Sequence, residues 1–202
     1  WMESAGQYNP LASDDHQWDF KRAMEICDSA INSFSDSRGA TLCKQLQLSI
    51  QTKKIRATIE ENNLPNQPFR AFLQYRNFTN LQYRIISVTS AEVQELRAKL
   101  NRDREGREEE RFIEHFTTKP TFKAGKFSLP DDGDFQEHSI EVKLDALPIG
   151  EYMVLFSNQE NFATEKNGLA YAFTRISNIS YINRAIPDGS TEFFVLHRET
   201  GE

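Results

Sequence analysis

The side chains that could do chemistry are few and scattered in this chain of 202 residues. Its four histidines occur singly, at His16, His115, His138 and His197. No two of them have the spacing of a zinc-binding or metalloprotease motif, and no Gly-x-Ser-x-Gly or phosphate-binding glycine motif occurs. A hydrolase could use only His115 beside Glu114 or His138 beside Glu137, and exposed polar residues are the ordinary interpretation of both. The sequence therefore predicts no enzyme, no catalytic residue, and no cofactor or metal.

Two further patterns have a chemical and a structural interpretation. Asp131-Asp-Gly-Asp134 resembles part of a calcium loop, but it lacks regular ligand spacing and a distal bidentate Glu, which favours an acidic turn. Phe69, Tyr75 and Tyr83 alternate at strand spacing. Packing in a core explains these aromatic residues better than a platform that stacks bases or sugars.

The two cysteines, Cys27 and Cys43, have a definite relation to each other. Cys27 lies seven residues before Phe34, and Cys43 lies six residues after Ser37. In two antiparallel helices with a rise of ~1.5 Å per residue, both fall roughly 10 Å from the turn. They could form a disulfide, which would imply an oxidising cell envelope or exterior, or they could be two adjacent reduced core cysteines. The sequence leaves both alternatives open.

The elements that would position these residues begin with a helical hairpin over 14–51. Asp14 or Asp15 can cap a first helix that runs to about Phe34, and Ser37 can cap a second. The apolar residues of each helix follow steps of three and four, giving one stripe per helix. A lone hairpin cannot bury both stripes, so we expect the region 1–52 to pack on neighbouring elements.

From Lys53 the hydrophobic period changes from helical to two-residue alternation. Strands are expected near 55–59, 69–75, 81–85, 135–144, 152–157, 169–183 and 191–198. The segment Lys143–Ser157 predicts a hairpin closed by a Pro-Ile-Gly turn. Thr89-Ser-Ala-Glu92 is a capping-box pattern, so residues 90–117 are predicted as a helical insertion whose mixed-charge run is a solvated face. The predicted fold class is α+β, with a domain 53–202 that is an antiparallel β-sandwich.

Composition excludes some classes of function. The chain is 38% hydrophobic and 27% charged, as globular proteins are, and its net charge of −6 disfavours nucleic acid as a partner. No apolar run reaches the ~18 residues of a membrane span. The chain runs from Trp1 to Glu202 without a charged-then-apolar leader, and we expect it to be a piece of a longer protein.

Four segments, in order along the chain, resemble parts of one family. They are Ala30–Leu46, Ile55–Glu60 with Leu73–Asn77, Leu147–Val154 and Phe193–Gly201. The first is similar to the helical segment before the first macroglobulin-type domain of large bacterial alpha-2-macroglobulin-like proteins. The second resembles the opening strands of that domain, the third its recurrent hairpin, and the fourth its strand followed by a Thr-Gly turn.

This resemblance implies a macroglobulin-type or fibronectin-III-like sandwich in a cell-envelope protein, periplasmic or at the surface and lipid-anchored when intact, that traps or inhibits proteases. The family's reactive Cys-x-Glu-Gln thioester matches neither Cys27-Asp-Ser-Ala30 nor Cys43-Lys-Gln-Leu46, and no protease-bait segment is identifiable. The implied role is therefore a non-catalytic scaffold. Its implied partners are the neighbouring domains of the parent and a protease bound by the parent.

The alternative interpretation is a surface adhesin or a carbohydrate-binding sandwich, which would need exposed aromatic residues on one sheet face. For either function, we expect apolar surfaces to remain open on the isolated chain and to favour pairing through Leu42, Leu46 or the last strand, because an open strand edge is a template for another strand.

Overall fold

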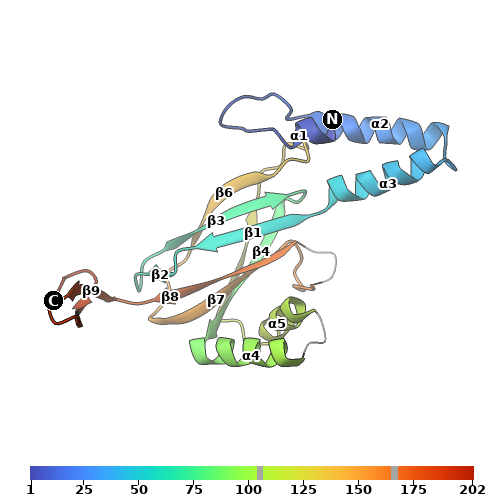
Figure 1. Ribbon diagram of the computed structural model, residues 1–202. Coiled ribbons are helices and arrows are strands. Elements are labelled where there is room, and N and C mark those ends of the chain that lie inside the picture. Colours follow the sequence, from blue (N-terminus) through green and yellow to red (C-terminus); the bar gives the residue numbers. More distant parts are fainter. Residues whose placement is uncertain (104–106, 165–167) are drawn as a thin grey trace.

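The computed structural model describes residues 1–103, 107–164 and 168–202, and Figure 1 shows their arrangement. The fold is α+β, as predicted. Helices α1 (Met2–Ala5), α2 (Asp19–Ser33) and α3 (Arg38–Gln51) come first, and a β-sandwich follows. Helices α4 (Ser90–Asp103) and α5 (Glu108–Thr117) lie between two of its strands. The proposed domain boundary near residue 53 falls where α3 ends and the first strand begins.

The sandwich consists of two sheets. The smaller sheet has the order β1 (Lys54–Ile59), β3 (Phe69–Arg76) and β6 (His138–Leu144), all antiparallel. The larger sheet has the order β2 (Asn62–Asn63), β8 (Leu169–Ile176), β7 (Gly150–Ser157), β4 (Asn80–Val88) and β5 (Lys123–Ser128). Its strands are antiparallel except for the short β2–β8 pair, which is parallel.

Strand β7 shows how the hydrophobic core is divided into two layers. Tyr152, Val154 and Phe156 point between the two sheets, where they pack with residues such as Leu73 and Leu144. Met153 and Leu155 point the other way and pack with residues of α4 and α5. Figure 1 shows these two helices beside the larger sheet. Because both faces of β7 are buried, its sequence is continuously apolar rather than alternating.

The predicted hairpin Lys143–Ser157 is wrong. Strand β6 pairs with β3 in the smaller sheet, whereas β7 pairs with β4 and β8 in the larger one. The Pro-Ile-Gly link therefore crosses from one sheet to the other. Leu147 is buried in the core within this link, and its carbonyl accepts a hydrogen bond from the Asn66 amide at 3.0 Å. Local turn chemistry is the same for a hairpin and for a link between sheets, so it cannot distinguish them.

The N-terminal helices agree with the prediction in part. Ser37 caps α3, accepting a hydrogen bond from the Ala40 amide at 3.1 Å. Helix α2 begins at Asp19, later than predicted, because the chain before it forms turns and His16 has a positive φ of 68°. Leu42, expected on the apolar stripe of α3, is 55% exposed. Ala40 and Ile50 are the buried residues of that helix.

The chain ends in a third sheet, of two strands, that stands off the sandwich. The single strand predicted over 169–183 is interrupted at Ser177-Asn178, which separates β8 from β9 (Ile179–Ala185). Strand β9 pairs only with β10 (Thr191–His197), and Figure 1 shows this hairpin beyond the end of the sheet that contains β8. Among the described residues, no helix is long and apolar enough to cross a membrane.

Candidate functional site

The most concentrated group of polar side chains lies where the N-terminal helices meet the sandwich. At its centre is Asp134, which is fully buried in the loop before β6. Its Oδ1 accepts hydrogen bonds from the Gln136 amide at 2.8 Å and from His138 Nε2 at 3.0 Å. Its Oδ2 accepts one from Gln17 Nε2 at 3.1 Å. We call Asp134, Gln136, His138 and Gln17 the polar junction.

Gln136 extends this junction to the backbone of the N-terminal region. Its side chain is buried, and Nε2 lies 3.2–3.3 Å from the carbonyl oxygens of Ala5, His16 and Gln17. The preceding residue, Phe135, packs with Phe20 and Ile50 in an apolar cluster shared with the helices. One short loop of the sandwich therefore provides both polar and apolar contacts to the helical region.

Arg76, at the end of β3, joins the helices to the sandwich from the other side. Its guanidinium lies over the Phe20 ring at 4.5 Å and donates from Nη2 to the Ile50 carbonyl at 3.0 Å. Burial lowers the pKa of Arg76, and the charges of Glu137 and Asp134 oppose this effect. The Asn77 side chain donates to the same carbonyl at 2.7 Å and to Thr52 at 3.0 Å. The end of α3 is thus fixed by side chains of the sandwich.

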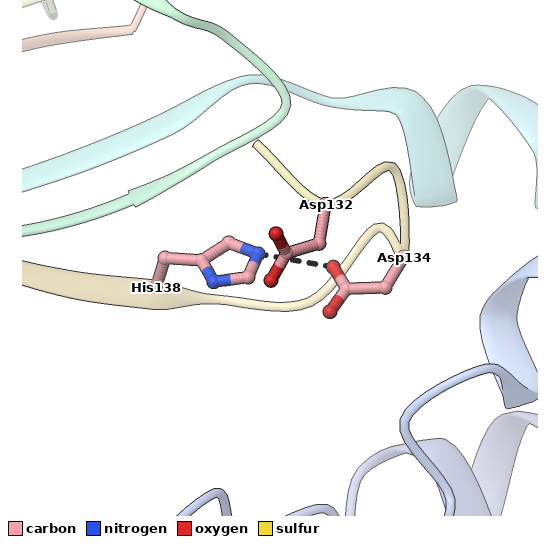
Figure 2. A group of neighbouring side chains, drawn as sticks. All are labelled: Asp132, Asp134 and His138. Atoms are coloured by element: carbon pink, nitrogen blue, oxygen red, sulfur yellow. Dashed lines mark hydrogen bonds and ion pairs between the residues drawn. The ribbon is translucent and has the colours of Figure 1, made fainter. Parts of the chain in front are cut away.

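Three of these neighbouring residues could offer ligands to a metal ion. Asp132, Asp134 and His138 each place one ligand atom so that all three lie within 4.8 Å of one another, as Figure 2 shows. A carboxylate can only accept hydrogen bonds, so His138 Nε2 carries the proton in its contact with Asp134. A cation would have to displace that proton and compete with Gln17 and Gln136 for the same oxygens. The arrangement is therefore better suited to hydrogen bonding than to metal binding.

The acidic turn before Asp134 also has a local explanation. The Asp131 carboxylate accepts a hydrogen bond from the Gly133 amide at 2.9 Å, and Gly133 adopts a positive φ of 68° that suits glycine. Tyr75, which lies opposite His138 in the β3–β6 pair, donates its hydroxyl to the Pro130 carbonyl at 2.6 Å. The turn is thereby fixed at both ends.

The two cysteines come together between α2 and α3, as their spacing predicts, and both are free thiols. Burial, followed by a hydrogen bond with Cys43, raises the pKa of Cys27 to about 11. A disulfide between them stays a prediction.

Of the other residues that the sequence singled out, Tyr75 borders the polar junction through the His138 ring, at 5.8 Å between ring centroids, and His115, Phe69 and Tyr83 belong to other parts of the fold. His115 Nε2 is 3.4 Å from Glu92 on the exposed side of α4 and α5, beside Lys119. Phe69, Tyr75 and Tyr83 are 5%, 2% and 8% exposed. These three aromatic residues belong to the core, so they do not form the open platform that carbohydrate binding would need.

A second polar cluster lies beside a cavity of about 230 Å³ between α4 and the ends of β7 and β8. Glu151 accepts hydrogen bonds from the Ser90 hydroxyl at 2.7 Å and from the Ser90 amide at 2.6 Å. It also accepts hydrogen bonds from the Arg175 guanidinium. The Ser90 hydroxyl bond is the largest cause that lowers the pKa of Glu151, while burial opposes it. The carboxylate thereby satisfies the first amide of α4.

Sequence reasoning missed the polar junction because Gln17 lies far along the chain from the other three members. Gln17 and Asp134 are separated by 117 residues, and a lone Gln in a predicted helix gives no signal. Two hints were available, His138 and the Asp131–Asp134 turn, but their interpretation as an exposed polar residue and an acidic turn did not indicate that Asp134 is buried between them and Gln17.

The fold and the junction define a β-sandwich module with an attached helical region. No protein-family model matches the chain, and no curated protein matches it either. Among solved structures, it is similar to native alpha-2-macroglobulin from Escherichia coli spanning domains MG0-NIE-MG1, at 13% identity and a TM-score of 0.45. That match covers 74% of this chain and 47% of the other, so this chain spans about half the length of the structure it matches.

Two other solved structures show a weaker likeness. The CARDB domain of the PF1109 protein from Pyrococcus furiosus, in complex with di-metal ions, has 10% identity and a TM-score of 0.33 over 61% of this chain and 91% of that one. Superoxide reductase from Ignicoccus hospitalis has 11% identity and a TM-score of 0.31 over 66% and 86% of the two chains.

Proposed function

We propose that this chain is a non-catalytic scaffold module of a larger alpha-2-macroglobulin-like protein, which acts in protease inhibition at the cell envelope. The observation that carries the proposal is the polar junction. The most concentrated buried polar group of the described residues holds two parts of the chain in a fixed relation, with each oxygen of Asp134 already accepting a hydrogen bond. Such an arrangement positions domains and leaves no activated nucleophile or base.

The resemblance of four segments to that family supports the identity of the parent. In the structure these segments form the α2–α3 turn, the paired strands β1 and β3, the link into β7, and β10 with the turn after it. They are therefore parts of the framework rather than an open site.

The full-length protein that contains this chain provides the test. We expect it to bind a protease and to change its pattern of limited proteolysis when it does, whereas the 202-residue chain alone should neither bind nor inhibit the same protease. A full-length protein that no protease binds or remodels would contradict the proposal. Inhibition by the isolated chain would contradict the scaffold role.

A further inference from the structure

The C-terminal hairpin β9–β10 exposes more large apolar side chains than the surface of a monomeric protein normally does. Its large apolar side chains are 39% to 68% exposed, and they are Ile179, Tyr181, Ile182, Phe193, Phe194 and Val195. They lie on two faces of the hairpin, with Ile182 and Phe194 on one and the other four on the opposite face, and together leave on the order of 600 Å² of apolar surface in water. The core clusters of the described residues end at Ile176, so the sandwich does not cover the hairpin.

The hydrogen-bond pattern shows which backbone groups face outward from β10. At the hairpin end, the Ile186 amide donates a hydrogen bond to the Ser190 carbonyl. From there, residue pairs that are hydrogen-bonded across the two strands recur at every second position. Phe194, opposite Ile182, therefore bonds within the hairpin, whereas Phe193 and Val195 direct their N–H and C=O groups away from β9. The same alternation turns the His197 amide outward, and that amide donates to the Glu202 carbonyl.

From Thr191 to Leu196, the outer edge of β10 has none of the features that usually block strand pairing, whereas at His197 the outward N–H and C=O groups are already bonded to Glu202 and Gly201. Its sequence Thr-Glu-Phe-Phe-Val-Leu-His contains no Lys, no Pro and no bulge, and no strand of the described residues pairs with that edge. Its one acidic residue, Glu192, forms an ion pair within the hairpin, with its Oε2 at 2.7 Å from Arg184 Nε. An isolated two-stranded hairpin is marginally stable in water, so added strands would stabilise it.

We propose that two copies of this chain pair through the outer edges of β10, antiparallel about a two-fold axis at Phe194, to form a four-stranded sheet. This register places Phe193 of one copy opposite Val195 of the second copy, and both residues present outward N–H and C=O groups. Phe194 meets its own counterpart on the axis, and Glu192 lies opposite Leu196. No like charges face each other, so the edge is complementary to itself.

The covered area sets the strength of this pairing. Edge pairing covers about half of this exposed apolar surface on each copy, which gives roughly 600 Å² in total, below the ~1,200 Å² of standard stable complexes. We therefore expect a weak dimer, with a dissociation constant on the order of 100 µM. Each copy carries a net charge of −6, so added salt should strengthen the association by screening this repulsion.

Sedimentation equilibrium of the 202-residue chain over a concentration series tests the proposal. We expect the weight-average mass to rise from 23.4 kDa toward twice that value. Val195→Lys should weaken association at least about tenfold, because it places a charge at an apolar strand edge. The matched control is Tyr181→Lys, on the same face but on β9, which should change it by less than about twofold.

Amide hydrogen exchange gives an independent measurement if a variant fails to fold. The amides of Phe193 and Val195 should become protected as concentration rises, while the outward amides of β9 should not. The proposal is overturned by a chain that stays monomeric at about 1 mM, a concentration well above the expected dissociation constant. It is also overturned if Tyr181→Lys abolishes association while Val195→Lys does not, or if an associated chain leaves both β10 amides unprotected.

Discussion

At the scale of single residues, Asp134 is the side chain on which the polar junction depends. In Asp134→Asn, the new amide would direct a donor at Gln17 or His138, both of which are donors in the native structure. A charge-assisted bond would be lost and a buried donor left unpaired, so we expect a loss of roughly 2–4 kcal/mol in the free energy of unfolding. Urea denaturation at pH 7 measures it.

The matched control for Asp134→Asn is Asp132→Asn, two residues away and exposed, which should change stability by less than about 0.5 kcal/mol. The same pair of variants separates hydrogen bonding from metal binding. If the junction works by hydrogen bonds, the Asp134→Asn loss is the same in EDTA and in Zn²⁺. A wild-type chain that Zn²⁺ stabilises strongly, with the gain lost in Asp132→Asn, would show that the three ligands hold an ion.

Cys27 should be an unreactive thiol in the reduced, folded chain. With a pKa raised to about 11, it is a neutral thiol at pH 8, and only about one molecule in a thousand carries the reactive thiolate. In Cys43→Ala, where Cys27 is the one remaining thiol and burial is the cause of its raised pKa that remains, we expect alkylation at pH 8 to be at least about tenfold slower in the folded than in the urea-unfolded protein. Equal rates would contradict the buried placement.

The predicted disulfide needs a separate measurement. Thiol titration of unfolded, unreduced protein should find no free thiol if Cys27 and Cys43 are bridged, and the folded chain would then come from an oxidising compartment. Two free thiols would rule the bridge out and leave a reduced pair in the core of the helical hairpin.

At the scale of elements, Glu151 anchors the start of α4 to strand β7. Its pKa is lowered in the folded chain, so it contributes stability above its unfolded pKa of about 4.3 and loses that contribution as pH falls through the lower folded pKa. Glu151→Gln should therefore cost about 1–2 kcal/mol at pH 7, and the difference from wild type should shrink below about pH 4. Denaturation series at both pH values measure this.

Glu160→Gln provides the control for this pH dependence, because Glu160 is an exposed carboxylate. We expect its change in the free energy of unfolding to stay within about 0.5 kcal/mol, as for an exposed surface residue. If Glu151→Gln gave the same small change at every pH, the link between Glu151 and Ser90 would not stabilise α4.

Several elements of this fold were predictable because their residues alternate. Strands β3 and β4 bury every second residue for most of their length, β1 alternates exposed and half-buried residues, and Ser37 indicated where α3 begins. The sequence pattern does not show which strands pair with each other, because pairing depends on the sheet to which each strand belongs. The link between β6 and β7 has the same turn residues as a hairpin, and only the burial of both faces of β7 separates the two cases.

At the scale of the whole molecule, the candidate site could not be predicted because tertiary contacts create it. Asp134 becomes a buried acceptor only when Gln17 approaches from the N-terminal region. In the hairpin β9–β10, by contrast, the sequence pattern is clear and the covering layer is what is missing from the described residues. Its apolar residues have the pattern of core strands, but the described residues provide no layer to cover them. A local pattern indicates which face should be buried, and it cannot say what buries it.

The same contacts make the helical region and the sandwich one cooperative unit. The two tryptophans, Trp1 and Trp18, both lie in the helical region, so tryptophan fluorescence reports on that part, while far-UV circular dichroism near 215 nm is weighted toward the sheets. In wild type we expect the two urea transitions to coincide. In Gln136→Ala, the buried Ala5 carbonyl and the partly buried His16 and Gln17 carbonyls lose a donor, so the fluorescence transition should move to lower urea than the dichroism transition.

Gln45→Ala is the control for Gln136→Ala, since Gln45 is an exposed residue of α3 and alanine favours helix. Its two transitions should stay together. Coincident transitions in Gln136→Ala would mean that the apolar cluster of Phe20, Ile50 and Phe135 couples the two parts without help from the polar junction. Separate transitions in wild type would mean that the helices dock only loosely, and a scaffold that holds its parts in a fixed relation would then have to obtain that rigidity from other contacts.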